Sequence, residues 1–190
     1  MSLKKYYNIG KTKLFPITRS LTGNGVKKTL NIIQKELPKL KIKKIKSGTK
    51  VFDWNVPEEW NVTDAYVVDK YNNRIIDFKK NNLHLVGYSI PIKKNITKKK
   101  LFKNLYFLKN QSKAIPYITS YYKRRWGFCI SYNEYKVFDK RYSLNDKFKV
   151  VINSNLNKKG NLNYGELILK VKKKKEILIS TYICHPSMAN

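Results

Sequence analysis

Cysteine is nearly absent from the sequence. Among its 190 residues there are two cysteines, Cys129 and Cys184, and they do not form a CxxC pair. Two isolated cysteines cannot supply the disulfide framework of a small secreted domain, so a reducing, cytoplasmic setting is expected. No apolar run approaches the roughly 18 residues of a membrane-spanning helix, and the basic N-terminus lacks the apolar core of a signal peptide. The sequence therefore predicts a cytoplasmic protein with no membrane partner.

Several motifs of common enzyme classes are also absent. The sequence has no Gly-rich phosphate loop, no GxSxG nucleophile elbow and no HExxH motif. The first motif cradles nucleotide phosphates, the second presents a catalytic serine, and the third places two metal-binding histidines on one helix face. Their absence argues against the P-loop, nucleophile-elbow and zincin classes of enzyme.

Acidic residues are scarce, which leaves the chain strongly basic. It has 12 Asp and Glu against 41 Lys and Arg, a formal charge of +29. The few arginines are Arg19, Arg74, Arg124, Arg125 and Arg141. Arginine is the preferred residue for bidentate phosphate and base-edge contacts, so a nucleic acid partner is not favoured. Lys, Asn, Ile and Tyr share A/T-rich codons, and a solvated lysine surface explains the charge better than an acidic polymer partner does.

The sequence does contain enough apolar and aromatic residues for a folded core, 42% and 13% respectively. Apolar residues at helical spacing predict a helix over residues 26–37, capped at its start by Thr22 or Asn24. Thr97 is placed to cap a short helix, and Ser131 opens a capping box before another. Helices alone do not account for the pattern, because β-rich runs separate them.

The β-rich runs predict most of the remaining elements. They cover residues 41–46, 65–69, 74–78, 83–90, 115–122, 126–130, 147–153 and 162–169. The second and third runs predict a hairpin, and so do the last two. Together with the helices, these runs predict an α/β protein.

The C-terminal stretch carries the most informative residues. Residues 176–183 form a nearly continuous apolar run, typical of a strand buried on both faces of an α/β sheet. His185 follows at the carboxyl end of this strand, where open α/β sheets place their ligands. An imidazole there can bind a metal, or it can be an ordinary hydrogen-bonded histidine. Cys184 is a ligand, a nucleophile or, more simply, an inert buried thiol.

Several segments resemble a bacterial family of aminopeptidase-like proteins of unknown function, which occur near surface-polysaccharide biosynthesis genes. The similar segments share specific motifs and extend over nearly the whole chain. They are residues 14–23 (LFPITRSLTG), 47–54 (SGTKVFDW), 81–91 (NNLHLVGYSIP), 115–122 (IPYITSYY), 126–129 (WGFC) and 180–190 (STYICHPSMAN).

The resemblance implies a zinc-exopeptidase-like fold, a mixed sheet with flanking helices, interrupted by a small β-rich inserted module. Residues 1–52 and 125–190 would form the aminopeptidase-like domain, and residues 53–124 the module. The family's C-terminal winged-helix module is missing, so the chain is expected to be a C-terminally truncated fragment. Its isolated α/β sheet would leave apolar surface uncovered, and we expect it to be marginally folded or to aggregate.

The resemblance also implies a function and a metal site. The parent protein would be a zinc metallopeptidase, a hydrolase acting on a peptide or aminoacyl-amide substrate, including a surface-sugar precursor. His185 matches the first metal-ligand position. The catalytic carboxylate and the other ligands are expected after Asn190, so the fragment is expected to bind metal poorly and to be inactive.

Other residue groups have two interpretations each. Tyr121, Tyr122 and Trp126 line a substrate groove or pack in the core. His84 is expected to be a structural histidine rather than a ligand. The acidic residues Asp53, Glu58, Glu59 and Asp64 are expected at the surface rather than in a metal or base site.

Two further functions stay open. The basic surface is consistent with a non-catalytic binding protein for acidic polysaccharide or nucleic acid, whose binding would weaken steeply with salt. A degenerate pseudo-peptidase that keeps the fold without the chemistry is the other alternative.

Overall fold

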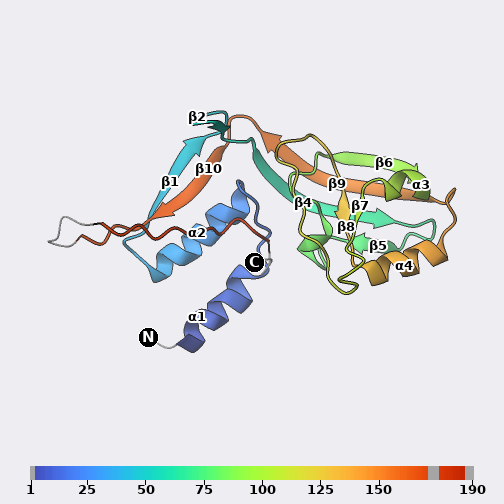
Figure 1. The fold of residues 1–190 in the computed structure, drawn as a ribbon, viewed down its shortest axis with the longest axis horizontal. Coiled ribbons are helices and arrows are strands. Elements are labelled where there is room, and N and C mark those ends of the chain that lie inside the picture. The colour runs from blue at the N-terminus through green and yellow to red at the C-terminus, as the bar shows by residue number, and fades with distance from the viewer. Residues whose placement is uncertain (1–2, 171–175, 187–190) are drawn as a thin grey trace. The chain divides into compact units, whose positions relative to one another are not determined.

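A computed structural model describes residues 3–170 and 176–186 of the chain. The structure divides into two compact units. The first, here the terminal unit, comprises Met1–Glu59 with Asn157–Asn190, and the second, the central unit, comprises Trp60–Leu156 (Figure 1). The chain is a mixed α/β protein, and each unit is described by itself.

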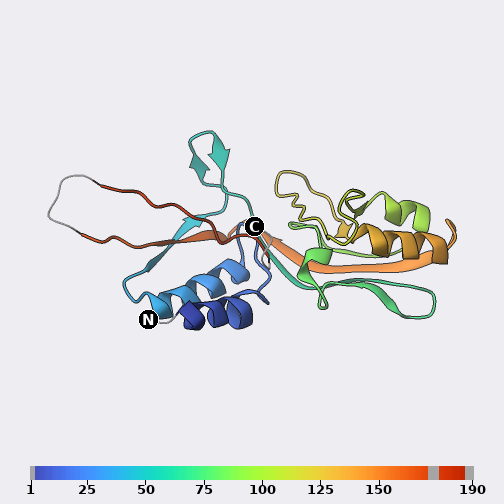
Figure 2. The same ribbon diagram turned by 60° about the horizontal axis from the view of Figure 1, so that its bottom comes forward.

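The terminal unit places helices beside a two-stranded ribbon. Its elements are α1 (Leu3–Ile9), a π-helical turn (Gly10–Leu14), α2 (Asn24–Glu36), β1 (Lys41–Lys46), β2 (Lys50–Val51), β3 (Trp54–Asn55) and β10 (Asn161–Glu166). Strands β1 and β10 pair antiparallel, from Lys41 opposite Glu166 to Lys46 opposite Asn161. Helix α2 lies along this ribbon (Figures 1 and 2) and buries Val26 and Leu30. Burial of this apolar stripe stabilises the unit.

The helix predicted over residues 26–37 is confirmed as α2, but its predicted cap is wrong. The N-cap is Gly23, which has φ of 99° and offers no side chain. Thr22 is engaged elsewhere, because its hydroxyl donates a 3.2 Å hydrogen bond to the carbonyl of Glu58. The first turn of α2 also passes very close to the preceding loop. A Cβ on Gly25 would lie 1.9 Å from the carbonyl oxygen of Thr18, so only glycine fits there.

The central unit is built on a four-stranded sheet of order β5-β4-β9-β6. The strands are β4 (Glu59–Val68), β5 (Arg74–Asp77), β6 (Ile92–Thr97) and β9 (Lys147–Asn157). Two short strands, β7 (Leu105–Tyr106) and β8 (Phe128–Cys129), pair in parallel. The helical elements are a 3-10 turn (Asn82–His84), α3 (Lys98–Phe102) and α4 (Tyr132–Arg141). The largest fully buried side chains include Phe128, Phe148, Leu101, Ile152 and Val67, which form the core of this unit.

Local sequence signals predicted several elements of this unit correctly. Strands β4 and β5 form the expected antiparallel hairpin. The Thr97 side chain caps α3 by accepting from the amide of Lys100. Ser131 and Glu134 form the full capping box at the start of α4, each binding the other's backbone amide. These signals are contained within a few consecutive residues, which is why they can be read from the sequence.

The strand predicted over residues 83–90 is wrong. The Asn81 side chain accepts from the amide of Leu83 and turns the chain into the 3-10 helix. Tyr88 then takes φ of 62°, in the left-handed region that a strand excludes. The run over residues 115–122 is likewise not a strand, apart from a single bridge between Thr119 and Gly87.

The predicted hairpin of residues 147–153 and 162–169 is also wrong. Both runs contain strands, but β9 pairs with β6 whereas β10 pairs with β1. The two strands follow one another along the chain and belong to different sheets. Strands that are adjacent in the sequence often pair as a hairpin. Here β9 pairs with β6 and β10 pairs with β1 instead.

The prediction of a buried strand over residues 176–183 is wrong as well. The described residues of this segment form no strand, and Ile177, Leu178 and Ile179 are about nine-tenths exposed, at 90%, 91% and 88%. A strand buried on both faces needs neighbouring strands for its hydrogen bonds and covering layers for its side chains. Among residues 3–170 and 176–186, none supplies them to this segment.

The limits of the central unit differ from those predicted for the inserted module. The prediction gave residues 53–124, whereas the compact unit runs from Trp60 to Leu156, because β9 pairs with β6. The identification of this unit as an insertion in a peptidase fold stays a prediction.

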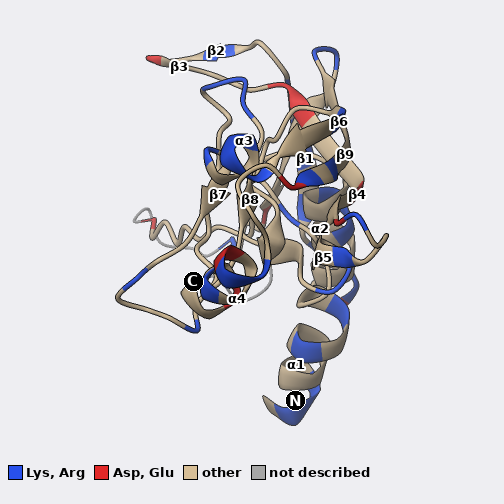
Figure 3. Ribbon diagram, turned by 90° about the vertical axis from the view of Figure 1, so that its right-hand side faces the viewer, with Lys and Arg blue, Asp and Glu red and all other residues tan. Residues whose placement is uncertain are grey.

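Basic residues outnumber acidic ones along the helices of both units. Figure 3 shows lysine and arginine along α1, α3 and α4, with fewer acidic positions between them. No helix in the described ranges has the length and apolarity required to cross a membrane.

Candidate functional site

The backbone of His185 is held by a buried arginine in the terminal unit. The Nε atom of Arg19 donates a 2.8 Å hydrogen bond to the carbonyl oxygen of His185. Its Nη1 atom donates to the carbonyl of Leu14 at 2.5 Å. Arg19 is only 8% exposed. The arginine therefore fixes the loop that carries His185 against the loop that precedes α2.

The surroundings of His185 disfavour an anionic thiolate ligand. Burial raises the pKa of the Cys184 thiol, although its own backbone amide and the charge of Arg19 partly oppose the shift. Burial also lowers the pKa of Arg19, and Cys184 acts in the opposite direction. A raised thiol pKa keeps Cys184 protonated at neutral pH. This supports the interpretation of Cys184 as an inert thiol.

The residues near His185 do not by themselves fit a zinc site. Zinc in proteins is held by three or four nitrogen, sulfur or oxygen ligands. Within residues 3–170 and 176–186, no group of three or more His, Cys, Asp and Glu side chains is placed to hold a metal ion. The imidazole instead meets the ring of Tyr182 edge to face, with centroids 5.2 Å apart. The described residues thus bring one candidate ligand, His185, and not a complete site.

His84 is confirmed as a structural histidine. Its Nδ1 atom lies 2.8 Å from the carbonyl oxygen of Cys129, which links the 3-10 turn to β8. Its Nε2 atom lies 3.8 Å from Glu134, the capping-box residue of α4. Both ring nitrogens of the buried imidazole therefore face partners within the central unit, the Cys129 carbonyl and the half-exposed Glu134 carboxylate, as expected for a histidine with a packing role.

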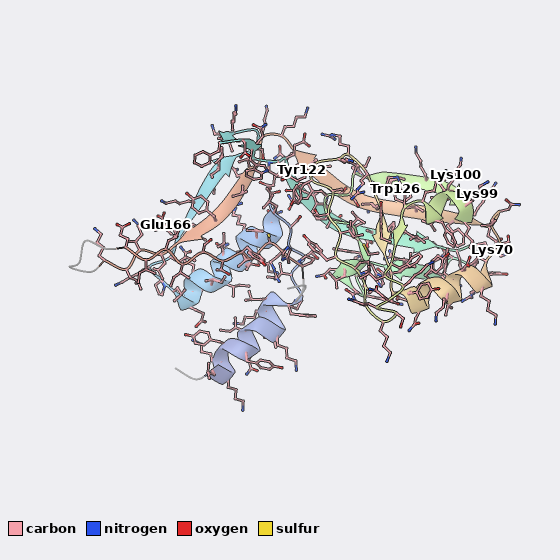
Figure 4. All side chains as sticks on the ribbon, in the orientation of Figure 1. Lys70, Lys99, Lys100, Tyr122, Trp126 and Glu166 are labelled. Carbon is pink, nitrogen blue, oxygen red and sulfur yellow. The ribbon has the colours of Figure 1, made fainter. Side chains whose placement is uncertain are left out.

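The three aromatic residues predicted to bind substrate do not form one cluster of rings. Tyr121 contacts Tyr122, with ring centroids 4.4 Å apart, and also Tyr88 at 5.6 Å. Trp126 instead has Phe128 as its ring neighbour, at 6.5 Å. Tyr122 and Trp126 both come from the segment that leads into β8 (Figure 4), and Tyr122 is 75% exposed. Their role in substrate binding stays a prediction.

Ser89 is a buried, multiply hydrogen-bonded residue that sequence reasoning missed. Its carbonyl oxygen accepts from the indole Nε1 of Trp60 at 3.0 Å and from the hydroxyl of Ser154 at 2.7 Å. Its own hydroxyl donates to the carbonyl of Val86 and accepts from the amide of Gly127. Ser89 is completely buried. The only sequence signal was its place in the segment 81–91, which gave no role to this residue.

Two of the acidic residues in the range 53–64, Glu59 and Asp64, have structural partners. Asp64 pairs with Arg74 at 3.2 Å and with Lys79 at 3.5 Å. The Glu59 carboxylate accepts from the amide of Asn161 at 2.9 Å. These contacts give Glu59 and Asp64 structural roles within their units.

The chain is similar in sequence to a known family and to a bacterial protein. A family model described as "Domain of unknown function (DUF4910)" matches residues 7–190. A Clostridium acetobutylicum protein called "Putative polysaccharide biosynthesis protein with aminopeptidase-like domain" is 49% identical over 178 residues, which cover 94% of this chain and 39% of that protein.

A solved structure is similar as well. The "Crystal structure of putative peptidase" from Clostridium acetobutylicum at 2.37 Å resolution is 47% identical, with a TM-score of 0.90. The match covers 98% of this chain and 42% of that one. The chain therefore spans about two-fifths of the length of the relatives it matches.

Proposed function

The chain belongs to the family described as "Domain of unknown function (DUF4910)", and from that premise we propose that it is part of a zinc-dependent aminopeptidase-like hydrolase acting on an amide or peptide bond. The names of the relatives, an aminopeptidase-like protein and a peptidase, support the reaction class. The proposal also assigns the terminal unit to a zinc-exopeptidase-like domain, with the β-rich central unit as the inserted module, in place of the limits 53–124 expected from the sequence. The substrate would be a peptide or an aminoacyl amide of a surface-sugar precursor, and the reaction would take place in the cytoplasm.

The observation that carries the proposal is the hydrogen bond from Arg19 to His185. Metal ligands need a fixed orientation, and polar contacts behind the ligand usually provide it. Arg19 does this through the backbone of His185, and it comes from the segment of residues 14–23 that resembles the family. In this proposal His185 supplies one metal ligand, and the whole protein supplies the remaining ligands and the general base. The 190-residue chain alone would then be inactive.

A chimera tests this function. The chain replaces the matching segment of the Clostridium acetobutylicum relative, and the product is assayed for release of nitroaniline from aminoacyl nitroanilides. We expect activity that chelators remove and zinc restores, and that falls at least about a hundredfold in His185→Ala, since loss of a metal ligand disables the centre. Cys184→Ser is the matched control and should keep activity.

Two results would count against it. Activity that survives chelation, or that is equal in the His185→Ala chimera, would remove His185 from the metal site. If the relative and the chimera are both inactive in this assay, the result would favour a pseudo-peptidase.

A second candidate function is non-catalytic binding of an acidic polysaccharide or nucleic acid. The formal charge of +29 favours it. Binding to heparin or to DNA should then lose affinity steeply between 50 and 200 mM salt, on the order of a hundredfold or more, because each neutralised anionic group releases a counterion. Affinity that is independent of salt would exclude a charge-driven partner.

A further inference from the structure

The central unit carries an open hollow on its sheet. Its volume is about 510 Å³, and it crosses the sheet from β4 over β9 to β6. It is lined by Asn61 and Thr63 of β4, by residues 91–93 at the start of β6, and by residues 152–155 of β9. Small-molecule sites in proteins occupy about 300–1,000 Å³. The hollow is therefore large enough for a ligand of two or three sugar rings.

The lining has a distinctive chemical character. The lining includes three carboxamides, Lys93 and the ring of Pro91. Ile92, Ile152 and Ser154 alternate with Lys93, Asn153 and Asn155 along their strands, so their side chains point to the other face of the sheet. Carboxamides both donate and accept hydrogen bonds, so they match the adjacent hydroxyl groups of a sugar, while the ring of Pro91 suits its C–H face. Among the described lining residues, Lys93 is the one charged group and no carboxylate is present. The charge of the hollow therefore favours an anionic ligand.

The walls of the hollow are held in place by the sheet. Ile92 of β6 lies opposite Ile152 of β9 in the antiparallel ladder. The hydroxyl of Ser154 donates to the carbonyl of Ser89 at 2.7 Å, and the hydroxyl of Thr63 donates to the carbonyl of Asn153 at 3.3 Å. Binding groups carried on paired strands are more precisely positioned than groups on loops, and little ordering is needed when a ligand binds.

We propose that this hollow binds an anionic saccharide, with sugar hydroxyls on Asn61, Asn153 and Asn155 and the acidic group on Lys93. A nucleic acid is a poorer match, because strand binders combine several cations with aromatic platforms, and the lining has one cation and no aromatic ring. The proposal does not depend on hydrolase activity. It rests on the second candidate function, binding of an acidic saccharide, and gives that function a defined place in the central unit.

The test is a titration of the 190-residue chain with trigalacturonate, and with galactotriose as the uncharged probe, followed by NMR of the asparagine side-chain amides. We expect saturable shifts at Asn153 and Asn155, with galactotriose binding about tenfold more weakly, equivalent to about 1.4 kcal/mol. Lys93→Ala should reduce trigalacturonate affinity about five- to tenfold and leave galactotriose unaffected. Asn155→Ala should weaken both probes.

The matched control addresses the high overall charge. Lys94 is the next residue of β6, points to the opposite face of the strand and does not line the hollow. Lys94→Ala removes the same charge and should leave both affinities unchanged. Equal losses in Lys93→Ala and Lys94→Ala would mean diffuse charge attraction and would overturn the proposal. So would the absence of saturable binding below about 10 mM, which corresponds to under about 3 kcal/mol, or preferential binding of oligothymidylate at the same asparagines. Thermal unfolding of each variant confirms that it is folded.

Discussion

The side chain of Arg19 donates its Nε hydrogen bond to the backbone carbonyl of His185, 166 positions later in the sequence. The contact joins the segment before α2 to the C-terminal loop. Because the guanidinium also binds the carbonyl of Leu14, a single side chain organises both segments. Residues 14–23, which resembled the family without a role that sequence could assign, thereby gain a structural purpose.

Loss of this arginine should release the His185 loop. For Arg19→Ala we expect the free energy of unfolding to fall by about 1–3 kcal/mol, since two partly buried carbonyls lose a charged donor. Amide hydrogen exchange at Cys184 and His185 should accelerate more than exchange in the central unit. Lys27→Ala, an exposed change on α2, is the control and should alter neither quantity. Unchanged exchange at His185 in Arg19→Ala would contradict the anchoring role.

Two glycine substitutions should have opposite outcomes. Gly25→Ala places a Cβ against the Thr18 carbonyl oxygen, and the backbone must move apart, at a cost of at least about 2 kcal/mol. Gly10→Ala meets nothing within 4 Å, and it should be neutral or stabilise the chain by up to about 1 kcal/mol. Chemical denaturation of both variants measures the difference. Equal midpoints would show that the close approach at α2 is not sustained in solution.

Lys98 is a buried lysine with a full set of acceptors. Its Nζ atom donates to the carbonyls of Asp139 and Tyr142 and pairs with the Asp139 carboxylate at 2.8 Å. Lys98→Met leaves the two carbonyls without their charged donor and should destabilise the chain by about 1–3 kcal/mol. The neighbouring Lys99 on α3 is exposed (Figure 4), so Lys99→Met should stay within about 0.5 kcal/mol. Thermal unfolding distinguishes them, and similar melting temperatures would refute the structural role of Lys98.

The pair of Tyr142 and Asp69 makes stability depend on pH at both extremes. The Tyr142 hydroxyl donates to the Asp69 carboxylate at 2.8 Å. Burial, with the nearby charge of Asp69, raises the pKa of Tyr142 to about 12. Because the folded pKa exceeds the ordinary value of 10, the stabilisation is complete below pH 10 and is lost as pH rises toward 12. Tyr142→Phe should cost about 1–2 kcal/mol at pH 8, and the deficit should shrink above pH 10.

Asp69 behaves in the opposite sense. Burial acts to raise its pKa, but hydrogen bonds from Asn73, Tyr142 and Tyr71 outweigh that effect and lower the pKa below 3.8. Its stabilisation is therefore present above about pH 4 and is lost as pH falls through the lowered value. Urea titrations at pH values from about 2 to about 12 measure the free energy of unfolding, and they test both the loss of stability in acid and the loss in base. A Tyr142→Phe deficit that is constant from pH 8 to 12 would rule out the coupling.

The sequence predicted elements whose signals are local. Helix α2 was predicted from the amphipathic spacing of its own residues. The capping box of Ser131 and Glu134 lies within a single helical turn. The hairpin of β4 and β5 is equally local. The α/β class followed from these elements, and the family from longer segments.

Elements fixed by distant partners were not predictable in this way. Strand β9 pairs with β6 and strand β10 pairs with β1, and both partners lie far away in the sequence. Tyr88 adopts a left-handed backbone that its residue type disfavours. The same holds for the candidate site, where His185 was found from its neighbours in the chain but Arg19 was not. The hydrogen bonds of Ser89 also come from residues in three other segments.

The order of strands in the central unit has an evolutionary consequence. The chain enters this unit along β4 and leaves it along β9, which are neighbours in one sheet. A segment whose two ends are adjacent can be gained, lost or exchanged by recombination with little disturbance to the protein that hosts it. Residues 60–156 therefore have the connectivity of a transferable cassette, free to acquire a binding specificity independently of the polypeptide on either side.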